Sequence, residues 1–264
     1  MSLNILISND DGYSAPGIRV LADELASLGR VRVIAPDGNR SGASNSLTLH
    51  QPIAFTQHED NLYSVDGTPA DCLQVAFGAL DIDADLVPDI VVSGINNGPN
   101  MADDTLYSGT VGAAMEGRAL RLPPIAVSMA TFAPTHYATA AKAVANIIRQ
   151  FVEPDHGSAL SAFSEGHVRP VLNVNVPDIA YSELAGMRIT RLGRRFPPAA
   201  ATLLEQNKTN PLYQLGSAGE IKDRSEGTDF HAVENGFVSI TPLQTDLTNL
   251  DKFAALSELL LTDS

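Results

Sequence analysis

The residues with the clearest capacity for chemistry are two adjacent carboxylates near the start of the chain. Asp10 and Asp11 come just after a short apolar run at 3–8, and Gly12 follows them. Neighbouring carboxylates repel each other, so a site that keeps both ionised favours a bound cation. Oxygen ligands of this kind suit Mg²⁺, Mn²⁺ or Ca²⁺ rather than zinc. Helix capping is the alternative, but it explains one aspartate more readily than two.

Two further polar loops supply side chains that suit the same chemistry. Ser41 lies in the loop 39–46, whose hydroxyls, amide groups and backbone N–H groups suit a metal or phosphate oxygens. Asn96 follows an apolar run at 89–93 and offers a neutral oxygen donor, and the glycines around it permit close approach of a ligand. Taken alone, the loop 39–46 is explained better by an ordinary polar loop, and the segment around Asn96 is explained equally well by an ordinary turn.

A third polar segment, Ser108-Gly109-Thr110, lies where a helix is expected to begin. Backbone N–H groups and the helix dipole make such a terminus a binding site for anions. Ser108 is also a good N-cap residue, and the two interpretations are compatible.

The elements that must position these residues alternate along the first two thirds of the chain. This alternation predicts an α/β fold with a parallel sheet wrapped by helices on both faces. Ligands bind such a sheet beyond the carboxyl ends of its strands, so the polar loops should meet at one edge. The predicted strands are 3–8, 31–35, 89–93, 125–129 and 171–176, with a β excursion at 47–66. The predicted helices are 16–28, 69–78, 108–120 and 136–151.

The sequence changes in character toward the C-terminus. The segment 193–230 is long, polar and irregular, which is typical of a functional loop or of an arm that reaches a partner. Strands are predicted at 187–191 and 237–242, and an amphipathic helix at 253–261. We therefore divide the chain into a catalytic core, 1–192, and an assembly region, 193–264.

Composition narrows the class of protein further. The 264 residues include 17 basic and 31 acidic side chains, a net charge of −14. A surface this acidic repels nucleic acid polymers and anionic membranes, so neither is an expected partner. A single cysteine, Cys72, excludes a disulfide framework and is expected in a helical core. Neither a signal peptide nor a membrane span is recognisable, and a cytoplasmic location is expected.

Several common catalytic motifs are missing from the sequence. It contains no P-loop, no dinucleotide fingerprint after the first strand, no nucleophile elbow and no zincin motif. The histidines lack the spacing of metal ligands; they are His50, His58, His136, His156, His167 and His231. Metal-assisted phosphoester hydrolysis is the chemistry that remains favoured. The alternative at this point is an enzyme with an aspartyl-phosphate intermediate on Asp10 or Asp11.

Several motifs taken in order resemble those of the SurE family of 5′/3′-nucleotidases, over nearly the whole chain. Asn9-Asp10-Asp11-Gly12 is similar to the opening signature of that family. The other matching segments are 15–17, 35–42 with Ser46, 67–72, 93–100, 107–111, 227–230 and 238–243.

The resemblance implies a Rossmann-like parallel sheet between helices, with a C-terminal β-hairpin arm and a terminal helix used in assembly as homodimers or homotetramers. It implies phosphomonoesterase activity on nucleoside 5′- and 3′-monophosphates and, in some members, on short polyphosphate. The alternative is a non-catalytic, Mg²⁺-dependent nucleotide sensor. One divalent cation per subunit, Mg²⁺ or Mn²⁺, is expected on Asp10, Asp11, Ser41 and Asn96. Substrate contacts are expected from Asn45, Asn100, Ser108, Gly109 and Thr110, and catalytic roles for Asp10, Asp11, Asn45 and Ser108.

Two segments depart from the family pattern. Many relatives have an Asp-Pro-Arg-Gly-like stretch where this chain has residues 207–211, and a tryptophan where it has Gln214. Both departures lie in the expected arm, so they bear on base stacking and substrate preference rather than on the reaction.

Overall fold

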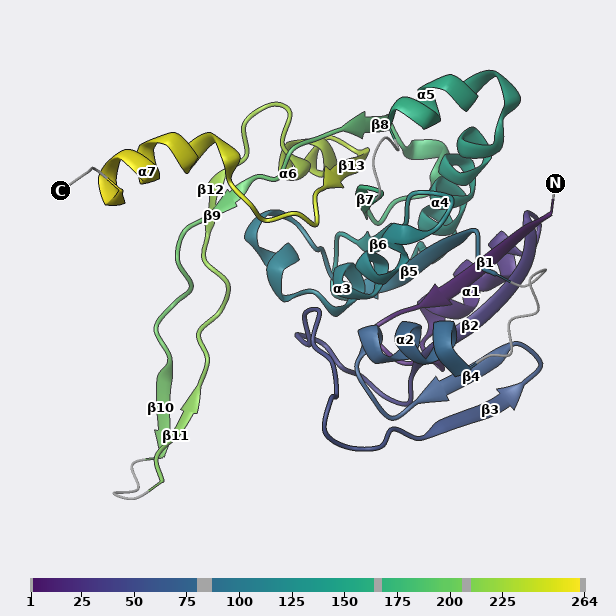
Figure 1. Cartoon of the computed structure of the whole chain (residues 1–264), viewed down its shortest axis with the longest axis horizontal. Helices are drawn as coiled ribbons and strands as arrows, with labels where there is room; N and C mark the ends of the chain where they lie inside the picture. The colour runs from purple at the N-terminus through teal and green to yellow at the C-terminus, as the bar shows by residue number, and fades with distance from the viewer. Residues whose placement is uncertain (1, 80–86, 164–167, 206–209, 262–264) are drawn as a thin grey trace.

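The computed structural model describes residues 2–79, 87–163, 168–205 and 210–261, and its main feature is a nine-stranded sheet. The strand order is β3-β4-β2-β1-β5-β6-β7-β13-β8 (Figure 1). The strands of this sheet are β1 (Leu3–Ser8), β2 (Gly29–Pro36), β3 (Phe55–Glu59), β4 (Leu62–Val65), β5 (Ile90–Asn97), β6 (Ile125–Met129), β7 (Val171–Val176), β8 (Gly186–Ile189) and β13 (Phe237–Leu243).

Most of the sheet is parallel, as predicted. The six central strands from β4 to β7 run in one direction. Two of the pairings are antiparallel, β3 with β4 at one edge and β13 with β7 near the other, and the edge strand β8 runs parallel to β13. The predicted α/β class with a Rossmann-like sheet is therefore confirmed.

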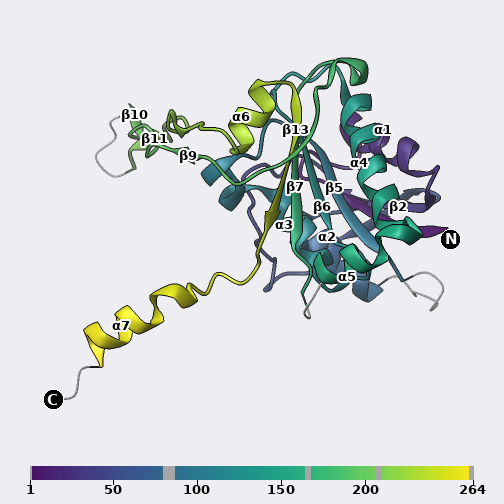
Figure 2. The same cartoon turned by 90° about the horizontal axis from the view of Figure 1, so that it is seen from above.

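Helices cover both faces of the sheet. On one face α1 (Pro16–Leu25) packs against α4 (Tyr137–Val152), and on the other α2 (Pro69–Ala79) packs against α3 (Gly109–Glu116) (Figure 2). In α1, the residues Ile18, Leu21 and Leu25 form the buried stripe expected of an amphipathic helix. The remaining helices are α5 (Gly157–Phe163), α6 (Asp229–Glu234) and α7 (Phe253–Leu260), and the 3₁₀ helix η2 (Ala102–Tyr107) precedes α3.

Several predicted boundaries differ from the structure. The helix expected at 16–28 ends at Leu25, because Gly29 already pairs with Leu3 of β1; a Cβ at Gly29 would lie 2.1 Å from the Leu3 carbonyl oxygen. The strand expected at 89–93 continues to Asn97. The helix expected at 108–120 ends at Glu116 and continues as the 3₁₀ turn Gly117–Ala119. Helix α5 and helix α6 were not predicted.

The core lies in two layers, one on each side of the sheet. The larger cluster joins β1, β5, β6 and β7 to the apolar stripes of α1 and α4. Smaller clusters lie under α2 and α3, and Cys72 is fully buried in one of them, as expected. Because both faces of the central strands are buried, the sequences of these strands are continuous apolar runs.

Two parts of the C-terminal region project from this body (Figure 1). The first is a hairpin arm in which β10 (Thr202–Glu205) pairs with β11 (Leu212–Gln214), and β9 (Arg194–Arg195) pairs with β12 (Ile221–Asp223) at its base. The second is α7. The predicted hairpin arm is therefore present; of the sequence departures, residues 207–209 lie outside the described part, and Gln214 is exposed at the end of β11. In the described part of the chain, no helix is long and apolar enough to cross a membrane.

Candidate functional site

A tight turn at the end of β1 presents the two aspartates. Asn9 is fully buried; its Oδ1 accepts a hydrogen bond from the Gly12 N–H (3.0 Å), and its Nδ2 donates to the Gly12 carbonyl (2.9 Å). These two bonds close the turn around Asp10 and Asp11. Asp10 is buried and Asp11 is half-buried, so the turn places both carboxylates at the carboxyl edge of the sheet.

The N-terminus of α3 lies directly against Asp10. The hydroxyl of Thr110 donates to Asp10 Oδ1 over 2.5 Å. A Cβ at Gly109 would lie 2.9 Å from Asp10 Cβ and 3.2 Å from Oδ2, so only glycine fits without displacing the aspartate. The sequence predicted that Thr110 contacts substrate, but its side chain is fully buried and used on Asp10, and its backbone N–H also hydrogen-bonds to that carboxyl group.

Asp11 is held by the end of β5. The Asn97 N–H donates to Asp11 Oδ2 (3.1 Å), and Asn39 Nδ2 lies 3.4 Å from Oδ1. Asn97 is itself fixed through its side chain, because the Tyr137 hydroxyl donates to Asn97 Oδ1 over 2.5 Å. The loop after β2, the end of β5 and the start of α4 therefore all contribute to the position of Asp11.

A β-bulge directs Asn96 toward the same site. The register of β5 against β6 shifts between Ser93 and Asn96, and Gly94 within the bulge has φ of +131°. The extra residue puts Ile95 on the α1 side and Asn96 opposite Ser128 on the α3 side. Asn96 Nδ2 donates to the Gly98 carbonyl (2.8 Å), which leaves Oδ1 as a ligand oxygen.

The electrostatics of the pair suit a cation. Burial raises the pKa of Asp10, although hydrogen bonds from Thr110 and backbone N–H groups oppose the shift. Burial also raises the pKa of Asp11, where the charge of Asp10 adds to the effect and the Asn97 N–H opposes it. Among the described residues, no lysine, arginine or histidine forms an ion pair with either carboxylate. A divalent cation would supply the compensating charge that the protein itself does not.

The loop after β2 reaches the site but leaves its side chains exposed. The Arg40 N–H donates to the Asp10 carbonyl (2.7 Å), which holds the loop beside the aspartates. Ser41 is exposed, and within the described residues no contact joins its hydroxyl to Asp10 or Asp11. Asn45 is also exposed, and it lies over α3, where a Cβ at Gly112 would come within 3.0 Å of Asn45 Cα.

Ser108 and Asn100 flank the site on the side of α3. Ser108 caps the helix, since its Oγ accepts from the Val111 N–H (3.0 Å). The predicted N-cap is thus present, and the first free N–H groups of α3 lie next to Asp10. Asn100 is 7% exposed, and its Nδ2 donates to Ser128 Oγ (2.8 Å).

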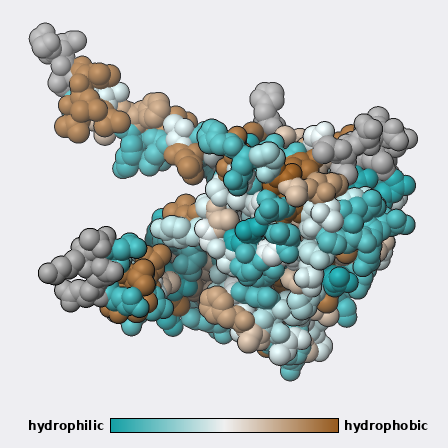
Figure 3. Space-filling view, turned by 90° about the horizontal axis from the view of Figure 1, so that it is seen from below, coloured by the Kyte–Doolittle hydropathy of each residue, from teal (hydrophilic) through white to brown (hydrophobic). Residues whose placement is uncertain are grey.

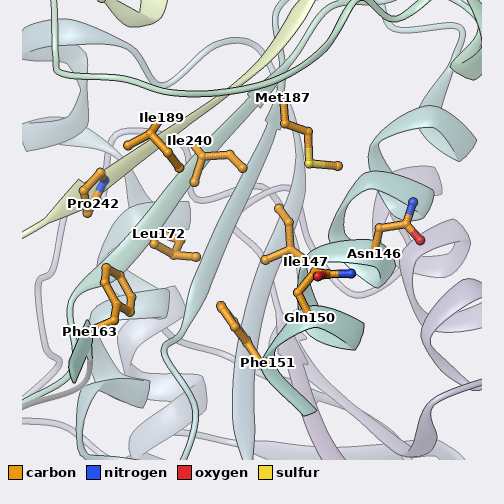
Figure 4. A pocket seen from close by; sticks show the side chains of 10 residues that line it. All are labelled: Asn146, Ile147, Gln150, Phe151, Phe163, Leu172, Met187, Ile189, Ile240 and Pro242. Carbon is orange, nitrogen blue, oxygen red and sulfur yellow. The ribbon is translucent and has the colours of Figure 1, made fainter. Parts of the chain in front are cut away.

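Two cavities differ sharply in chemistry and position. The more polar of the two, of about 850 Å³ and called the polar cavity below, includes Asn45 and Ser108 together with Arg118, Thr190, Arg191 and Thr241. The other, of about 670 Å³, is a groove between α4, α5 and the strands β7, β13 and β8. Figure 4 shows Leu172, Met187, Ile189 and Ile240 around this groove. Only the polar cavity adjoins the candidate site.

The sequence missed several residues that shape the site. Asn97 and Tyr137 are examples, because nothing in their local sequence indicates that they contact each other. Asn173 and Asn175 gave the clearest missed signal: two asparagines at alternate positions of an apolar strand place two amides on one buried face.

The fold and the site together define a class of α/β protein in which an acidic pair and a helix N-terminus meet at the carboxyl edge of a parallel sheet. Residues 5–197 match the model of the family described as "Survival protein SurE". The chain belongs to this family, as its motifs indicated.

Relatives of known name cover almost the full length. A protein of Nitrosomonas eutropha named "5'-nucleotidase SurE" is 47% identical over 95% of this chain and 96% of its own. A protein of Legionella pneumophila strain Corby with the same name is 48% identical over 98% of this chain and 97% of its own length. The crystal structure of the SurE protein from Aquifex aeolicus superposes with a TM-score of 0.77 at 38% identity, covering 97% of this chain and 98% of that one.

Proposed function

We propose that this chain is an enzyme, a 5′-nucleotidase, that hydrolyses nucleoside 5′- and 3′-monophosphates to nucleoside and phosphate with the help of one divalent cation. The name of its full-length relatives supports the 5′-nucleotidase class. The observation that carries the proposal is the contact of Asp10, the neighbour of Asp11, with the N-terminus of α3. It supports a cation site beside an anion site, which is what a phosphomonoester requires.

Asp10, Asp11, Ser41 and Asn96 would hold the cation. The donor set consists of carboxylate, hydroxyl and amide oxygens, which suits Mg²⁺ or Mn²⁺, and Ca²⁺ could occupy the same oxygens. The buried, uncompensated carboxylates fit this role, and Asn96 Oδ1 is available to it. A bound divalent cation supplies Lewis-acid polarisation of a phosphate oxygen and a water of lowered pKa.

The chain's own groups would hold the phosphate and stabilise its charge. The backbone N–H groups of Gly109 and Thr110 begin α3 and have no partner within the helix, and the Ser108 hydroxyl lies beside them. Asn45 and Asn100 approach from the neighbouring loops and supply amide donors. Fixed donors aimed at a phosphoryl group stabilise the charge that develops there without further reorganisation.

The polar cavity would take the nucleoside. It adjoins Asn45 and Ser108, and its volume of about 850 Å³ exceeds what a nucleoside needs. Gln244 and Thr245 line it beside Thr190 and Thr241, whose hydroxyls hydrogen-bond each other, so polar partners for the sugar or the base are present. An open cavity of this size agrees with turnover of both 5′- and 3′-phosphates and of short polyphosphate.

The test is phosphate release from a panel of nucleoside 5′- and 3′-monophosphates in EDTA, Mg²⁺ or Mn²⁺, with Asp10→Ala as the control. We expect release that requires metal and is lost in the variant. Release in EDTA at the full rate would refute the cation site, and no release from any member of the panel would refute the nucleotidase.

We further propose that residues 193–264 assemble the chain into homodimers or homotetramers, while residues 1–192 carry out catalysis. The arm and α7 both expose large apolar side chains, including Leu203, Leu212 and Tyr213 on the arm and Leu256 and Leu259 on α7 (Figure 3). The apolar groove beside β8 would receive α7 of a second copy, because each surface offers the apolar area that the other leaves uncovered.

A further inference from the structure

The face of the sheet under α3 changes from apolar to polar toward the candidate site. Near the amino ends of the strands this face carries Leu6, Val91, Ala126 and Val171, which pack in the core. Further along, the same face carries polar side chains that are also buried, and they cross five neighbouring strands: Ser8, Ser93, Ser128, Asn173, Asn175, Ser239 and Thr241. Burying so many polar groups is costly unless they serve a partner.

Asn173 and Asn175 have such a partner in Asn100. The Asn100 N–H donates to Asn175 Oδ1 (2.9 Å). The Asn100 carbonyl accepts from Asn173 Nδ2 (2.7 Å) and from Asn175 Nδ2 (3.0 Å). Both asparagines of β7 are fully buried, and all three bonds end on the backbone of one residue.

Asn100 needs these bonds because no secondary structure supplies them. It lies between the end of β5 at Asn97 and the start of η2 at Ala102, in a segment with no ladder or helix of its own. Buried backbone groups require partners, and here two side chains provide them. With its backbone fixed in this way, the Asn100 side chain reaches Ser128 Oγ, and its orientation at the edge of the site is set.

We infer that Asn173 and Asn175 are positioning residues for the reaction, which act by holding Asn100 so that its amide meets the substrate. The inference rests on the proposed function, in which Asn100 contacts the phosphate. Asn175 should matter more than Asn173, because it binds both the N–H and the carbonyl of Asn100, whereas Asn173 binds only the carbonyl.

The experiment is a double-mutant cycle measured as kcat/KM for AMP. The variants are Asn100→Ala, Asn175→Ala, Asn173→Ala and the double variant of residues 100 and 175. Ser239→Ala is the matched control, because Ser239 pairs in register with Asn175 on the same buried face but contacts Thr190 (2.8 Å) and not Asn100.

We expect Asn175→Ala to lower kcat/KM about 30-fold and Asn173→Ala about fivefold, since a displaced binding group can cost about 100-fold. Ser239→Ala should stay within about twofold. In the Asn100→Ala background, Asn175→Ala should have almost no further effect, because residues that act through one group are not additive. A purely structural role would give the same fold-loss in both backgrounds.

The outcomes separate the inference from the function on which it rests. If Asn100→Ala is impaired while both variants of β7 are fully active, or if the losses at residues 100 and 175 multiply, the positioning role is overturned. If the wild-type chain releases no phosphate, the proposed function falls first. Should Asn175→Ala fail to fold, as judged by circular dichroism, a cycle of Asn100→Ala, Asn173→Ala and the double variant of residues 100 and 173 decides the question.

Discussion

The carboxyl edge of the sheet and the two C-terminal projections depart from ordinary burial in opposite ways. At the edge, polar side chains such as Asp10 and Asn175 are buried and hydrogen-bonded. Asp10 accepts from Thr110 of α3, and Asn175 accepts from the Asn100 N–H. On the arm and α7, large apolar side chains are exposed; Leu215 is 86% exposed and Leu259 is 74% exposed. Each departure costs free energy in an isolated chain.

The difference teaches what kind of partner each region lacks. Buried carboxylates without a counter-ion call for a cation and a charged ligand, which are small and strongly polar. Exposed apolar side chains on extended elements call for a large apolar surface, which another protein copy provides. The same chain therefore separates a site for chemistry from surfaces for assembly, and the following predictions test that separation.

The largest expected effect is on activity, from Asp10→Asn. We expect kcat for AMP to fall about 1,000-fold, because the change removes a metal ligand and its charge at the reacting centre. Stability of the metal-free protein should not fall, since burial disfavours the charge of Asp10. Phosphate release and urea unfolding measure the two effects.

Asp155→Asn is the control for that change, because Asp155 is exposed in the turn Pro154–His156, away from the site. Near wild-type turnover by Asp10→Asn would show that Asp10 is not needed for the reaction. It would contradict the assignment of the carboxyl edge of the sheet as the catalytic site.

A second large effect is expected on assembly, from Leu256→Asp combined with Leu259→Asp in α7. Two charges on its apolar face should weaken self-association at least about 100-fold, because burying an unpaired charge costs several kcal/mol. Light scattering coupled to size exclusion should then report a smaller species, with the circular dichroism of the core unchanged.

Glu258→Gln on the same helix is the control, and it should leave the assembly intact. A wild-type chain that is already monomeric at micromolar concentration would contradict the assembly role of the projections.

A smaller effect on activity is expected from Gly109→Ala at the start of α3. The added Cβ would lie 2.9 Å from Asp10 Cβ, so either the aspartate or the helix must shift. We expect kcat/KM to fall about tenfold, since catalysis is sensitive to displacements of this size. Steady-state kinetics with AMP measures it.

Gly78→Ala in α2 is the matched control, because a Cβ there meets nothing within 4 Å. It should leave activity unchanged and raise stability by about 0.5–1 kcal/mol, the usual gain when alanine replaces glycine in a helix. Equal kinetics for the two variants would show that the contact with Asp10 is not critical.

The smallest effect on turnover is expected from Asp71→Asn. This change should instead lower the free energy of unfolding. Asp71 accepts hydrogen bonds from the Thr48 N–H (2.9 Å), the Thr48 hydroxyl (2.7 Å) and the Thr68 N–H (2.8 Å), and so ties the loop after β2 to α2. Burial alone raises the pKa of this carboxyl, but the hydrogen bonds from Thr48 and Thr68 bring it below 3.8.

Because the pKa is lower in the folded state, the stabilisation is complete above the unfolded value and is lost as pH falls through the folded one. We expect Asp71→Asn to lose about 2 kcal/mol at pH 7 and the gap to wild type to narrow below about pH 4. Urea unfolding at both pH values measures this, with Asp60→Asn at an exposed turn as control. A gap that is independent of pH would exclude the carboxylate charge as its cause.

Features of the fold and the site that depend on neighbouring residues could be predicted from the sequence. Features that depend on contacts between distant segments could not. Strands 125–129 and 171–176 were predicted to the residue, since apolar runs between turn residues are local signals. The bulge at Gly94 was not, because it exists only where β5 meets β6. Without the bulge, ordinary alternation would have turned Asn96 away from the site.

The sequence by itself determined the α/β class, the family, and the residue types gathered near the site, because alternating periodicity and short motifs are properties of contiguous residues. Only the tertiary structure decided which groups touch: Thr110 on Asp10, Tyr137 on Asn97, and the two asparagines of β7 on Asn100. These pairs lie 40 to 100 positions apart in the sequence. Their contact follows from the order and register of the strands, which no local pattern encodes.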